Sequence, residues 1–192
     1  MILPTLIQSD PPLYLGPTPD DLVVRPEGAL ISLVPTKRWH AGQLLFPMVD
    51  SLAPSALPER ADLERFLARA HERVSLGATY WHCQRGMNRS GFAVAAYLAL
   101  YRGDRISSAI AELRSLRSPL VLQNVSFERA LRSWYGDADE QDFEPVDLVA
   151  VYRELGVDIP PQVLLEPIPM PEHDEHDDAD VVLRFGDDED PR

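Results

Sequence analysis

The sequence predicts an α/β fold, and two changes of pattern along the chain indicate it. Short apolar runs bounded by proline and glycine fill the first part of the chain, as is typical of strands. From residue 58 onward, apolar residues recur at helical spacing between charged ones. The only cysteine directly follows a short predicted strand. Ligand sites of open α/β sheets lie beyond the carboxyl ends of strands, so this position predicts a functional site.

The strands are predicted from apolar runs and from the residues that end them. Prolines and Gly16 break or bound the first two runs, which suits edge strands joined by turns. The third run is almost wholly apolar, as in a buried strand, and it ends at Pro35. Asp50 ends the fourth run, and Cys83 follows the fifth. The predicted strands are residues 2–7, 13–15, 29–34, 44–49 and 79–82.

The helices are predicted from the period and composition of the remaining segments. The first begins near residue 58 and is expected to stop at Gly77. Residues 90–102 are nearly devoid of charge, so this helix is expected to be central and buried on most sides. Ser107 is a plausible N-cap for a helix over residues 107–117. Further helices are predicted over residues 125–135 and, as a short one, 145–155.

Charge divides the chain into a mildly basic part and an acidic part. Residues 1–136 hold 15 Lys and Arg against 12 Asp and Glu, a net charge of +3. Residues 137–192 hold 3 against 19, a net charge of −16. The first part is long enough for one domain with a sizeable core. Residues 137–170 are predicted to be an extension that could include the short helix. Residues 171–192 are predicted to be a disordered acidic tail, because such segments bury too little apolar surface to offset chain entropy.

Cysteine usage and the amino terminus bear on the compartment. The single cysteine excludes an intramolecular disulfide, and a nucleophilic thiol requires a reducing compartment. Residues 1–12 lack the features of a signal peptide, and no stretch approaches the ~20 apolar residues of a membrane span. These features predict a soluble, cytoplasmic protein. His173 and His176 lie among carboxylates, where solvated side chains are expected rather than a metal site.

Residues 80–91 place the cysteine, two glycines and two arginines in one predicted turn. Five residues separate Cys83 from Arg89, enough for the backbone to curl once and bring the arginine back towards the sulfur. Gly86 would allow the curl without a Cβ clash, and Gly91 would allow the next helix to lie close to neighbouring backbone. The loop N–H groups and the N-terminus of that helix would converge on one anion. The stretch therefore predicts a phosphate-binding loop.

The same surroundings favour an ionised sulfur at Cys83. Converging donors, a helix dipole and a nearby guanidinium lower the pKa of such cysteines from about 8.5 to roughly 3.5–7.5. Cys83 is therefore predicted to be mostly thiolate at neutral pH and to act as a nucleophile. The alternative is a small buried apolar residue, the usual state of a lone cysteine.

The loop resembles a known signature. Residues 82–91, HCQRGMNRSG, match the HCxxGxxRSG pattern of the cysteine-dependent protein tyrosine phosphatase superfamily. The spacing and the short chain are similar to the dual-specificity branch, as is the sequence LYLG at residues 13–16. The resemblance covers residues 1–136 and implies a catalytic domain with a central mixed sheet flanked by helices. It also implies a reaction without metal or cofactor.

A weaker match follows further along the chain. Residues 118–124 resemble the RPxxxPN segment of this family, with Ser118 at the arginine and Gln123 at the second proline. The resemblance implies that Asn124 hydrogen-bonds either the loop or a neighbouring side chain.

The resemblance also assigns roles within the loop. Cys83 would attack phosphorus to give a phosphocysteine, and Arg89 would hold two phosphate oxygens through its planar guanidinium. Ser90 would donate to the sulfur or simply cap the helix. His82 would lie behind the loop, where it orients backbone and lowers the cysteine pKa, or be a satisfied core histidine. The predicted phosphate-binding loop comprises Gln84, Arg85, Gly86, Met87, Asn88 and Arg89.

Hydrolysis through a phosphocysteine also needs a carboxylic acid on a neighbouring loop. It protonates the leaving group and then activates water. Asp50, at the end of a predicted strand and 33 residues before Cys83, is the candidate. The acid of the dual-specificity branch follows a similar strand, which supports this choice. The alternative is a turn-forming aspartate before Ser51.

Two features of the sequence point to different substrates. Gly86–Arg89 resembles the GxNR form of RNA 5′-triphosphatases and related RNA phosphatases, a subgroup that often needs no aspartate acid. Asn88 therefore favours an RNA 5′ end, whereas Asp50 favours monoesters such as phosphotyrosine, phosphoserine or phosphothreonine in proteins. A phosphoinositide substrate and a catalytically inactive phosphate-binding module are further alternatives.

Basic residues outside the signature are candidates for substrate contacts. Lys37 and Arg38 form a basic pair after the third predicted strand, and Arg85 lies within the loop itself. Their positive potential would attract a phosphorylated substrate. The alternative for Arg85 is a solvated side chain at the rim of the loop.

Overall fold

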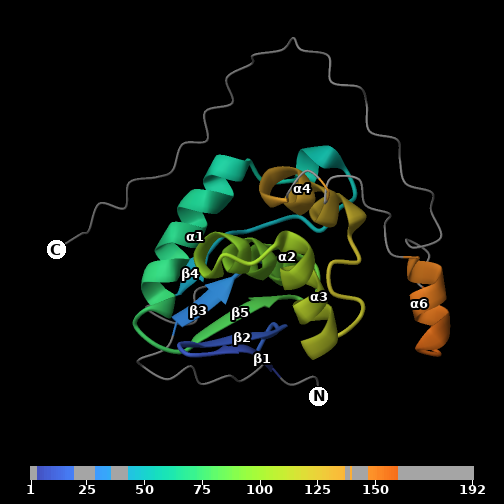
Figure 1. Ribbon diagram of the computed structural model, residues 1–192, viewed down its shortest axis with the longest axis horizontal. Coiled ribbons are helices and arrows are strands. Elements are labelled where there is room, and N and C mark those ends of the chain that lie inside the picture. The colour runs from blue at the N-terminus through green and yellow to red at the C-terminus, as the bar shows by residue number, and fades with distance from the viewer. Residues whose placement is uncertain (1–3, 20–28, 36–42, 137–138, 140–146, 160–192) are drawn as a thin grey trace, which may run out of the picture.

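The computed structural model describes residues 4–19, 29–35, 43–136, 139 and 147–159. The strands within them are β1 (Thr5–Ser9), β2 (Pro12–Pro17), β3 (Ala29–Ser32), β4 (Leu44–Leu45) and β5 (Thr79–Cys83). They form one sheet in the order β1-β2-β5-β3-β4 (Figure 1). β1 and β2 are antiparallel and the other neighbours are parallel, so the sheet is mixed, as the resemblance implied.

β2 lies inside the sheet, between β1 and β5, and the prediction of an edge strand is wrong. Its two prolines, Pro12 and Pro17, are its first and last residues. Their missing N–H groups therefore do not interrupt the ladder. The side chains of Leu13 and Leu15 are fully buried, as expected of a strand paired on both sides. The prolines mark the ends of an inner strand.

β4 is shorter than the strand predicted over residues 44–49, because regular pairing ends before Pro47, which has no N–H. The chain nevertheless stays beside β3. The N–H of Phe46 donates to the carbonyl of Ser32 (2.9 Å), and the N–H of Met48 donates to that of Leu33 (3.1 Å). This irregular continuation carries the chain to Asp50.

Four longer helices pack against the sheet and one another. They are α1 (Arg60–Val74), α2 (Arg89–Tyr97), α3 (Ile106–Leu116) and α4 (Val125–Tyr135). In Figure 1, α2 lies over the middle of the sheet, with α1 on one side and α3 on the other. α1 contacts β3, α2 contacts β5 and β2, and α3 contacts β1, while α4 packs on α2 and α3. All four helices were predicted from the sequence, the first from its apolar period and the second from its lack of charge.

The apolar helix predicted over residues 90–102 changes its geometry near the end. It is α-helical to Tyr97 and continues as a π-helical turn, η2 (Leu98–Arg102). Gly103 ends it with a left-handed φ of 76°, a conformation that glycine adopts at little cost. The residues from Ser90 to Leu98 are buried, so the expected central position is confirmed.

The start of α3 differs from the prediction. The helix begins at Ile106, with Arg105 at the N-cap, and Ser107 lies inside its first turn. The side chain of Ile106 is fully buried. The N-cap residue makes no side-chain capping hydrogen bond, and the first residue of the helix is part of the core.

The core lies between the sheet and the helices. Trp81 of β5, Phe92 of α2 and Phe127 of α4 are among its largest fully buried side chains, and the rings of Phe92 and Phe127 lie 4.9 Å apart. Every residue of β5 is buried. The loop that joins β5 to α2 is therefore held between two largely buried elements of the fold.

A buried carboxylate fixes the segment before α4. Glu128 is 2% exposed and receives Arg114 Nη2 at 2.6 Å and Arg132 Nη2 at 2.8 Å. Arg114 Nε also donates to the carbonyl of Val121 (3.0 Å). Paired, hydrogen-bonded burial is how a protein accommodates such a charge. The network ties the segment 118–124 to α3 and α4.

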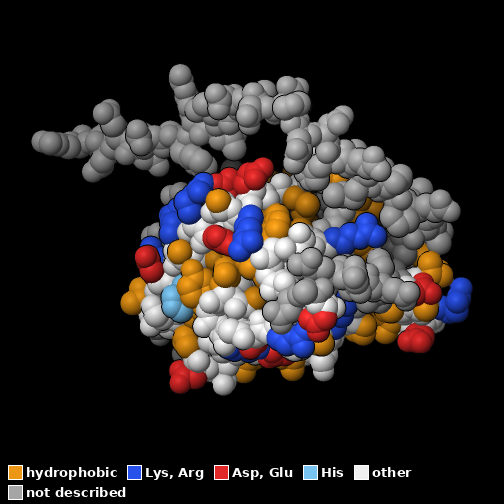
Figure 2. Space-filling model, turned by 45° about the horizontal axis from the view of Figure 1, so that its top comes forward, with side chains coloured by type: hydrophobic (Ala, Val, Ile, Leu, Met, Phe, Trp, Pro, Cys, Tyr) orange, Lys and Arg blue, Asp and Glu red, His pale blue; other side chains and the backbone are white. Residues whose placement is uncertain are grey.

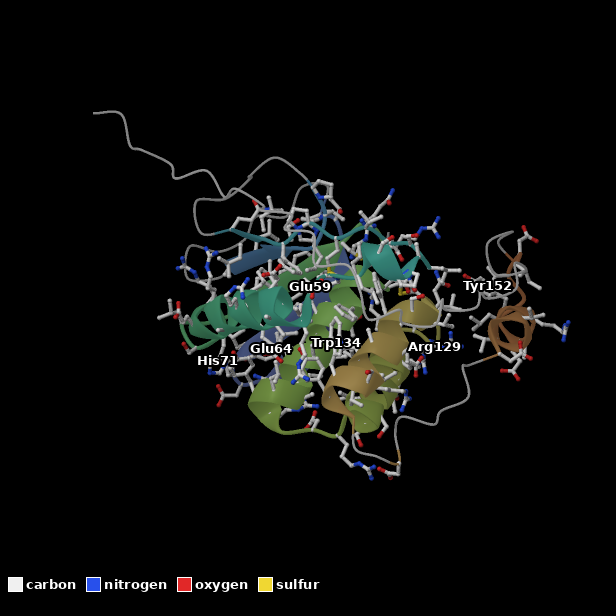
Figure 3. The ribbon with its side chains drawn as sticks, turned by 90° about the horizontal axis from the view of Figure 1, so that it is seen from above. Glu59, Glu64, His71, Arg129, Trp134 and Tyr152 are labelled. Carbon is white, nitrogen blue, oxygen red and sulfur yellow. The ribbon has the colours of Figure 1, made fainter. Side chains whose placement is uncertain are left out.

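The short helix α6 (Leu148–Glu154) lies within the stretch for which a short helix was expected. Tyr152 is on the side of α6 that faces the rest of the fold (Figure 3). Its hydroxyl donates to Gln123 Oε1 at 2.6 Å, and its side chain is buried. α6 is therefore tied to the segment before α4.

The surface of the described residues is mixed in character. In the view of Figure 2, basic and acidic side chains lie among apolar ones, and neither sign covers the face. Val49, directly before Asp50, is 64% exposed.

No helix in the described part of the chain is long and apolar enough to cross a membrane.

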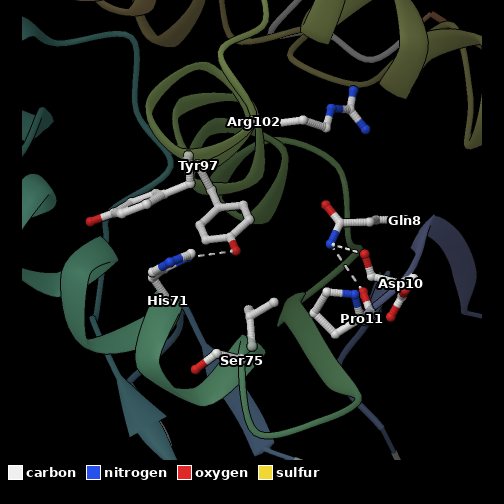
Figure 4. Close-up of a pocket in the computed structure, with 9 residues that line it drawn as sticks. Gln8, Asp10, Pro11, His71, Ser75, Tyr97 and Arg102 are labelled. Atoms are coloured by element: carbon white, nitrogen blue, oxygen red, sulfur yellow. Dashed lines mark hydrogen bonds between the residues drawn. The ribbon is translucent and has the colours of Figure 1, made fainter.

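A hollow of about 350 Å³ lies at the start of β5, the end of the sheet away from Cys83 (Figure 4). Within it, His71 Nδ1 and the hydroxyl of Tyr97 form a hydrogen bond of 3.0 Å. The lining residues are Gln8, Asp10, Pro11, His71, Val74, Ser75, Tyr97, Tyr101 and Arg102. Because Cys83 is at the other end of β5, this hollow is separate from the predicted site.

We expect Glu128→Gln to lower the free energy of unfolding by about 3 kcal/mol, because it leaves two arginines without their buried carboxylate. Glu112→Gln is the matched control, since Glu112 also pairs with an arginine but is exposed. Its loss should cost less than about 1 kcal/mol. Urea unfolding of both variants measures the difference, and equal losses would contradict a structural role for the buried network.

Candidate active site

The site is built on the loop between β5 and α2. Cys83 is the last residue of β5, and Arg89 is the first residue of α2. The segment after β4 brings Asp50 to this loop, and the segment before α4 brings Asn124. The four predicted residues therefore come from three separate parts of the chain and meet at the carboxyl end of β5.

Hydrogen bonds from outside the loop hold both of its limbs. Thr18 Oγ1 donates to the carbonyl of Cys83 (3.2 Å), and the N–H of Thr18 donates to that of Gln84 (3.4 Å). On the other limb, the N–H of Leu122 donates to the carbonyl of Met87 (3.5 Å). These carbonyls thus point away from the centre of the loop, towards their donors. Loop N–H groups are left to point into the centre of the loop.

Glycine is required at the turn of the loop. Gly86 has a φ of 69°, and a Cβ there would lie 2.2 Å from the carbonyl carbon of Gly16. The predicted need for glycine at this curl is confirmed. A Cβ on Gly91 would lie 2.9 Å from Val121 Cγ1. Gly91 therefore allows close approach to a side chain, whereas the prediction expected neighbouring backbone.

Cys83 is 2% exposed, and donors surround its sulfur. Burial raises the pKa of the thiol, but hydrogen bonds from the Ser90 hydroxyl and from the N–H groups of Ser90, Met87 and Arg85 outweigh it. The net effect lowers the Cys83 pKa. The structure thus provides the surroundings of an activated cysteine.

Ser90 donates its hydroxyl to the sulfur, with Oγ 3.2 Å from Sγ. Asn88 occupies the N-cap position of α2, and Ser90 lies within the first helical turn. Of the two functions considered for this serine, the structure places its hydroxyl at the sulfur and not at the helix cap.

His82 lies behind the loop and is fully buried. Burial lowers its pKa to about 4, so the ring is neutral near pH 7. It stacks on Tyr80, with the ring centroids 5.9 Å apart. A neutral ring brings no positive charge to Cys83. The expectation that His82 orients the loop backbone and lowers the cysteine pKa stays a prediction.

Arg89 and Asp50 lie next to each other at the mouth of the loop. Arg89 Nε is 3.9 Å from Asp50 Oδ2, and Arg89 Nη1 donates to the carbonyl of Met48 at 3.4 Å. The side chain of Asp50 is 31% exposed, so a substrate could reach it. This arrangement places a guanidinium, a group that can bind phosphate, beside a carboxyl group, which can transfer a proton.

The carboxylate of Asp50 is not used to form a turn. Ser51 Oγ accepts the N–H of Ala53 (3.1 Å), so the adjacent serine makes the local turn. Asp50 instead receives Asn88 Nδ2 on both oxygens (3.2 and 3.1 Å) and Asn124 Nδ2 on Oδ1 (3.0 Å). Asn124 therefore contacts both a neighbouring side chain and, through its backbone, the loop.

Arg117 supports the loop from behind, and sequence reasoning missed it. Its Nε donates to the carbonyl of Gly86 (3.4 Å), and its Nη2 donates to that of Arg85 (3.5 Å). Burial lowers the pKa of Arg117, and the charges of Tyr80 and Cys83 oppose that shift. The available signal was an arginine one residue before Ser118, where the family pattern has its own arginine.

The candidate substrate contacts are only partly described. Arg85 is exposed at the loop, near α6, and its charge opposes the rise in the Tyr152 pKa that burial causes. Lys37, Arg38, His173 and His176 lie outside the described residues. Among the residues that are described, no three His, Cys, Asp or Glu side chains gather as metal ligands would.

We expect Gly86→Ala to reduce turnover of an aryl phosphate by roughly 100-fold, because its Cβ would push the loop off Gly16 and misplace the reacting groups. Gly103→Ala is the matched control. Its φ of 76° imposes a similar backbone strain, but nothing lies within 4 Å of the added Cβ. Initial rates of the two variants would be compared, and a similar loss in both would contradict the argument.

We expect Ser90→Ala to raise the pKa of Cys83, since it removes a hydroxyl donor that favours the thiolate. The pH midpoint of Cys83 alkylation by iodoacetamide should move to higher pH. Because Cys83 is the only cysteine in the chain, the label reports this site alone. An unchanged midpoint would show that the loop N–H groups lower the pKa of Cys83 without help from the Ser90 hydroxyl.

No protein-family model matches the chain, and no curated protein sequence matches it. Solved structures do match. Human DUSP28 is 23% identical, with 69% of this chain and 92% of that chain covered and a TM-score of 0.52. Cydia pomonella PTP-2 phosphatase is 18% identical, with 69% and 90% covered and a TM-score of 0.57.

A third neighbour is the human tyrosine phosphatase-like serine/threonine/tyrosine-interacting protein. It is 16% identical, with 70% of this chain and 96% of that chain covered and a TM-score of 0.56. All three matches cover most of the neighbour's length. Because the sequence identities are low, the matches show a shared fold alone. The chain therefore has the fold of the dual-specificity branch of cysteine-dependent protein tyrosine phosphatases, as the loop signature predicted.

Proposed function

We propose that this chain is a cysteine phosphatase that hydrolyses phosphate monoesters, with phosphotyrosine, phosphoserine or phosphothreonine of proteins as substrates. The observation that carries the proposal is the pairing of an activated sulfur with a carboxyl group at one loop. Cys83 has a lowered pKa, and Asp50 is held across the same loop by hydrogen bonds to Asn88. A site that only bound phosphate would require neither group.

In the first step, the thiolate of Cys83 attacks phosphorus, and a sulfur–phosphorus bond forms as the bond from phosphorus to the leaving oxygen breaks. Arg89 and the loop N–H groups hold the phosphoryl oxygens as charge develops on them. Asp50, in its protonated form, gives its proton to the leaving oxygen. The products are the free alcohol and the phosphocysteine.

In the second step, water attacks phosphorus and gives a proton to the Asp50 carboxylate. The sulfur–phosphorus bond breaks, and inorganic phosphate leaves. The Ser90 hydroxyl, 3.2 Å from the sulfur, stabilises the departing thiolate by donating to it. Each group returns to its starting protonation state, and a reducing compartment such as the cytoplasm would keep the thiol active.

An RNA 5′-phosphate is the second candidate substrate, and Asn88 with the exposed Arg85 favours it. Arg85 adds positive charge at the loop, which suits a substrate with several phosphates. A pyrophosphate leaving group departs without a proton, so hydrolysis of an RNA 5′-triphosphate should depend little on Asp50. A phosphoinositide would use the same phosphate-binding groups and belongs in the same substrate panel.

A phosphate-binding module without turnover is the alternative from another class. One structural neighbour is described as phosphatase-like and as an interacting protein, so this fold is not confined to proteins called phosphatases. In this chain, Cys83, Arg89, Ser90 and Asp50 are all present at the loop. Their presence together supports the enzyme over the binding module.

We expect the wild type to hydrolyse p-nitrophenyl phosphate and Cys83→Ser to abolish this turnover, because the serine hydroxyl is not ionised. Asp50→Asn should slow turnover of phenyl phosphate, whose leaving oxygen is basic, by about 10²- to 10⁴-fold and remove the fall in rate at basic pH, since the proton donor is gone. Its effect on p-nitrophenyl phosphate should be smaller, because that leaving group is less basic. Rates would be measured from pH 4.5 to pH 8.5. A wild type inert on this substrate, on phosphopeptides and on an RNA 5′-triphosphate would favour the binding module.

A further inference from the structure

The orientation of two asparagine amides at the site is fixed by backbone donors. Asn88 Oδ1 accepts the N–H of Asn124 at 3.2 Å. Asn124 Oδ1 accepts the N–H groups of Ser126 (3.1 Å) and Phe127 (3.4 Å) as the N-cap of α4. Because each amide oxygen faces a backbone donor, each amide nitrogen must face the other way. Both nitrogens face Asp50.

The two amides bind the carboxyl group of Asp50 from two sides. Asn88 Nδ2 reaches both oxygens, at 3.2 and 3.1 Å, and Asn124 Nδ2 reaches Oδ1 at 3.0 Å. Asn88 and Asn124 are 7% and 4% exposed, so the two donor residues are buried, whereas the side chain of Asp50 is 31% exposed. Buried amide donors with fixed orientation hold their acceptor in one place.

Asn88 belongs to the loop, so this contact connects the acid to the phosphate site. The segment that carries Asp50 is also held at Ser51, whose carbonyl accepts Asn124 Nδ2 (2.9 Å), and at Leu52, whose carbonyl accepts Ser126 Oγ (2.7 Å). The amide of Asn88 holds only the carboxyl group of Asp50, whereas that of Asn124 also holds the carbonyl of Ser51. The bond from Ser126 to Leu52 depends on neither amide, so the backbone of the segment keeps this anchor when either amide is removed.

The amides also oppose an unproductive position of Asp50. Arg89 Nε lies 3.9 Å from Asp50 Oδ2, a separation too long for a hydrogen bond. Opposite charges this close attract each other. A carboxylate free of the amides would move onto the guanidinium, which is needed for phosphate. The amides keep the two groups apart, each available for its own task.

We propose that Asn88 and Asn124 are positioning residues that hold the Asp50 carboxyl group for proton transfer and tie its location to the phosphate-binding loop. The proposal rests on the phosphatase function proposed above. The amides then assist only those steps in which Asp50 moves a proton. Substrates with a basic leaving oxygen need that proton most, so the effect of losing an amide should grow with the basicity of the leaving group.

The test compares hydrolysis of phenyl phosphate, which has a basic leaving oxygen, with that of p-nitrophenyl phosphate. Asn88→Ala and Asn124→Ser each remove the amide donor, and serine at 124 keeps a capping oxygen for α4. We expect kcat/KM for phenyl phosphate to fall by about 10-fold or more, and that for p-nitrophenyl phosphate by less than about 3-fold. Ser126→Ala, which loses the bond to Leu52 but none to Asp50, should leave the ratio of the two unchanged.

A double variant separates positioning of Asp50 from other effects. In an Asp50→Asn background, adding Asn88→Ala should cause no further loss that depends on the leaving group. The alkylation midpoint of Cys83 and the melting temperature report whether the loop and the fold are intact. If Asn88→Ala disturbs either, Asn124→Ser decides the matter, since residue 124 is outside the loop.

Three outcomes would overturn the proposal. An equal loss on both substrates would show that the amides only shape the loop, and no loss on either would show that Asp50 needs no support. Both results leave the phosphatase function standing, because the wild type still turns over. A wild type inert on both substrates, on phosphopeptides and on an RNA 5′-triphosphate would remove the proposed function and this inference with it.

Discussion

A negative charge on a nearly buried sulfur is the constraint on which this structure depends. Burial opposes the thiolate of Cys83, so several hydrogen bonds must favour it together. Their convergence requires the backbone to curl tightly, and the curl requires Gly86 to lie against the backbone of Gly16. Outward carbonyls then need their own donors, which Thr18 and Arg117 supply. The packing of β2 and of the end of α3 against the loop therefore helps to keep the sulfur of Cys83 ionised.

The sequence was most informative where structure is local. The loop signature, the helix that follows it and the strand that leads into it are contiguous, so spacing alone predicts them. The identification of Asp50 needed the resemblance, because no local pattern distinguishes an acid from the aspartate of a turn. Only the contacts of Ser51 and Asn88 in the structure separate those alternatives.

The sequence failed where packing between distant segments decides. The prolines of β2 indicated an edge, but they stand at its two ends and β5 pairs along its length. Ser107 suggested a cap, but α3 begins one residue earlier, at the fully buried Ile106. Arg117 supports the loop through folding alone, since it lies 31 positions after Gly86 in the chain. Neither period nor propensity carries such information.

The contact of Tyr152 with Gln123 bears on what counts as the smallest working piece of this chain. Charge and the family resemblance suggested that a compact unit ends at residue 136, before α6. Yet Gln123 directly precedes Asn124, and its side-chain oxygen accepts a hydrogen bond from the hydroxyl of Tyr152 in α6. A version cut at residue 136 would expose that oxygen and loosen the neighbour of an active-site amide. Crystallisation or kinetic work on a trimmed protein would thus start from an altered site.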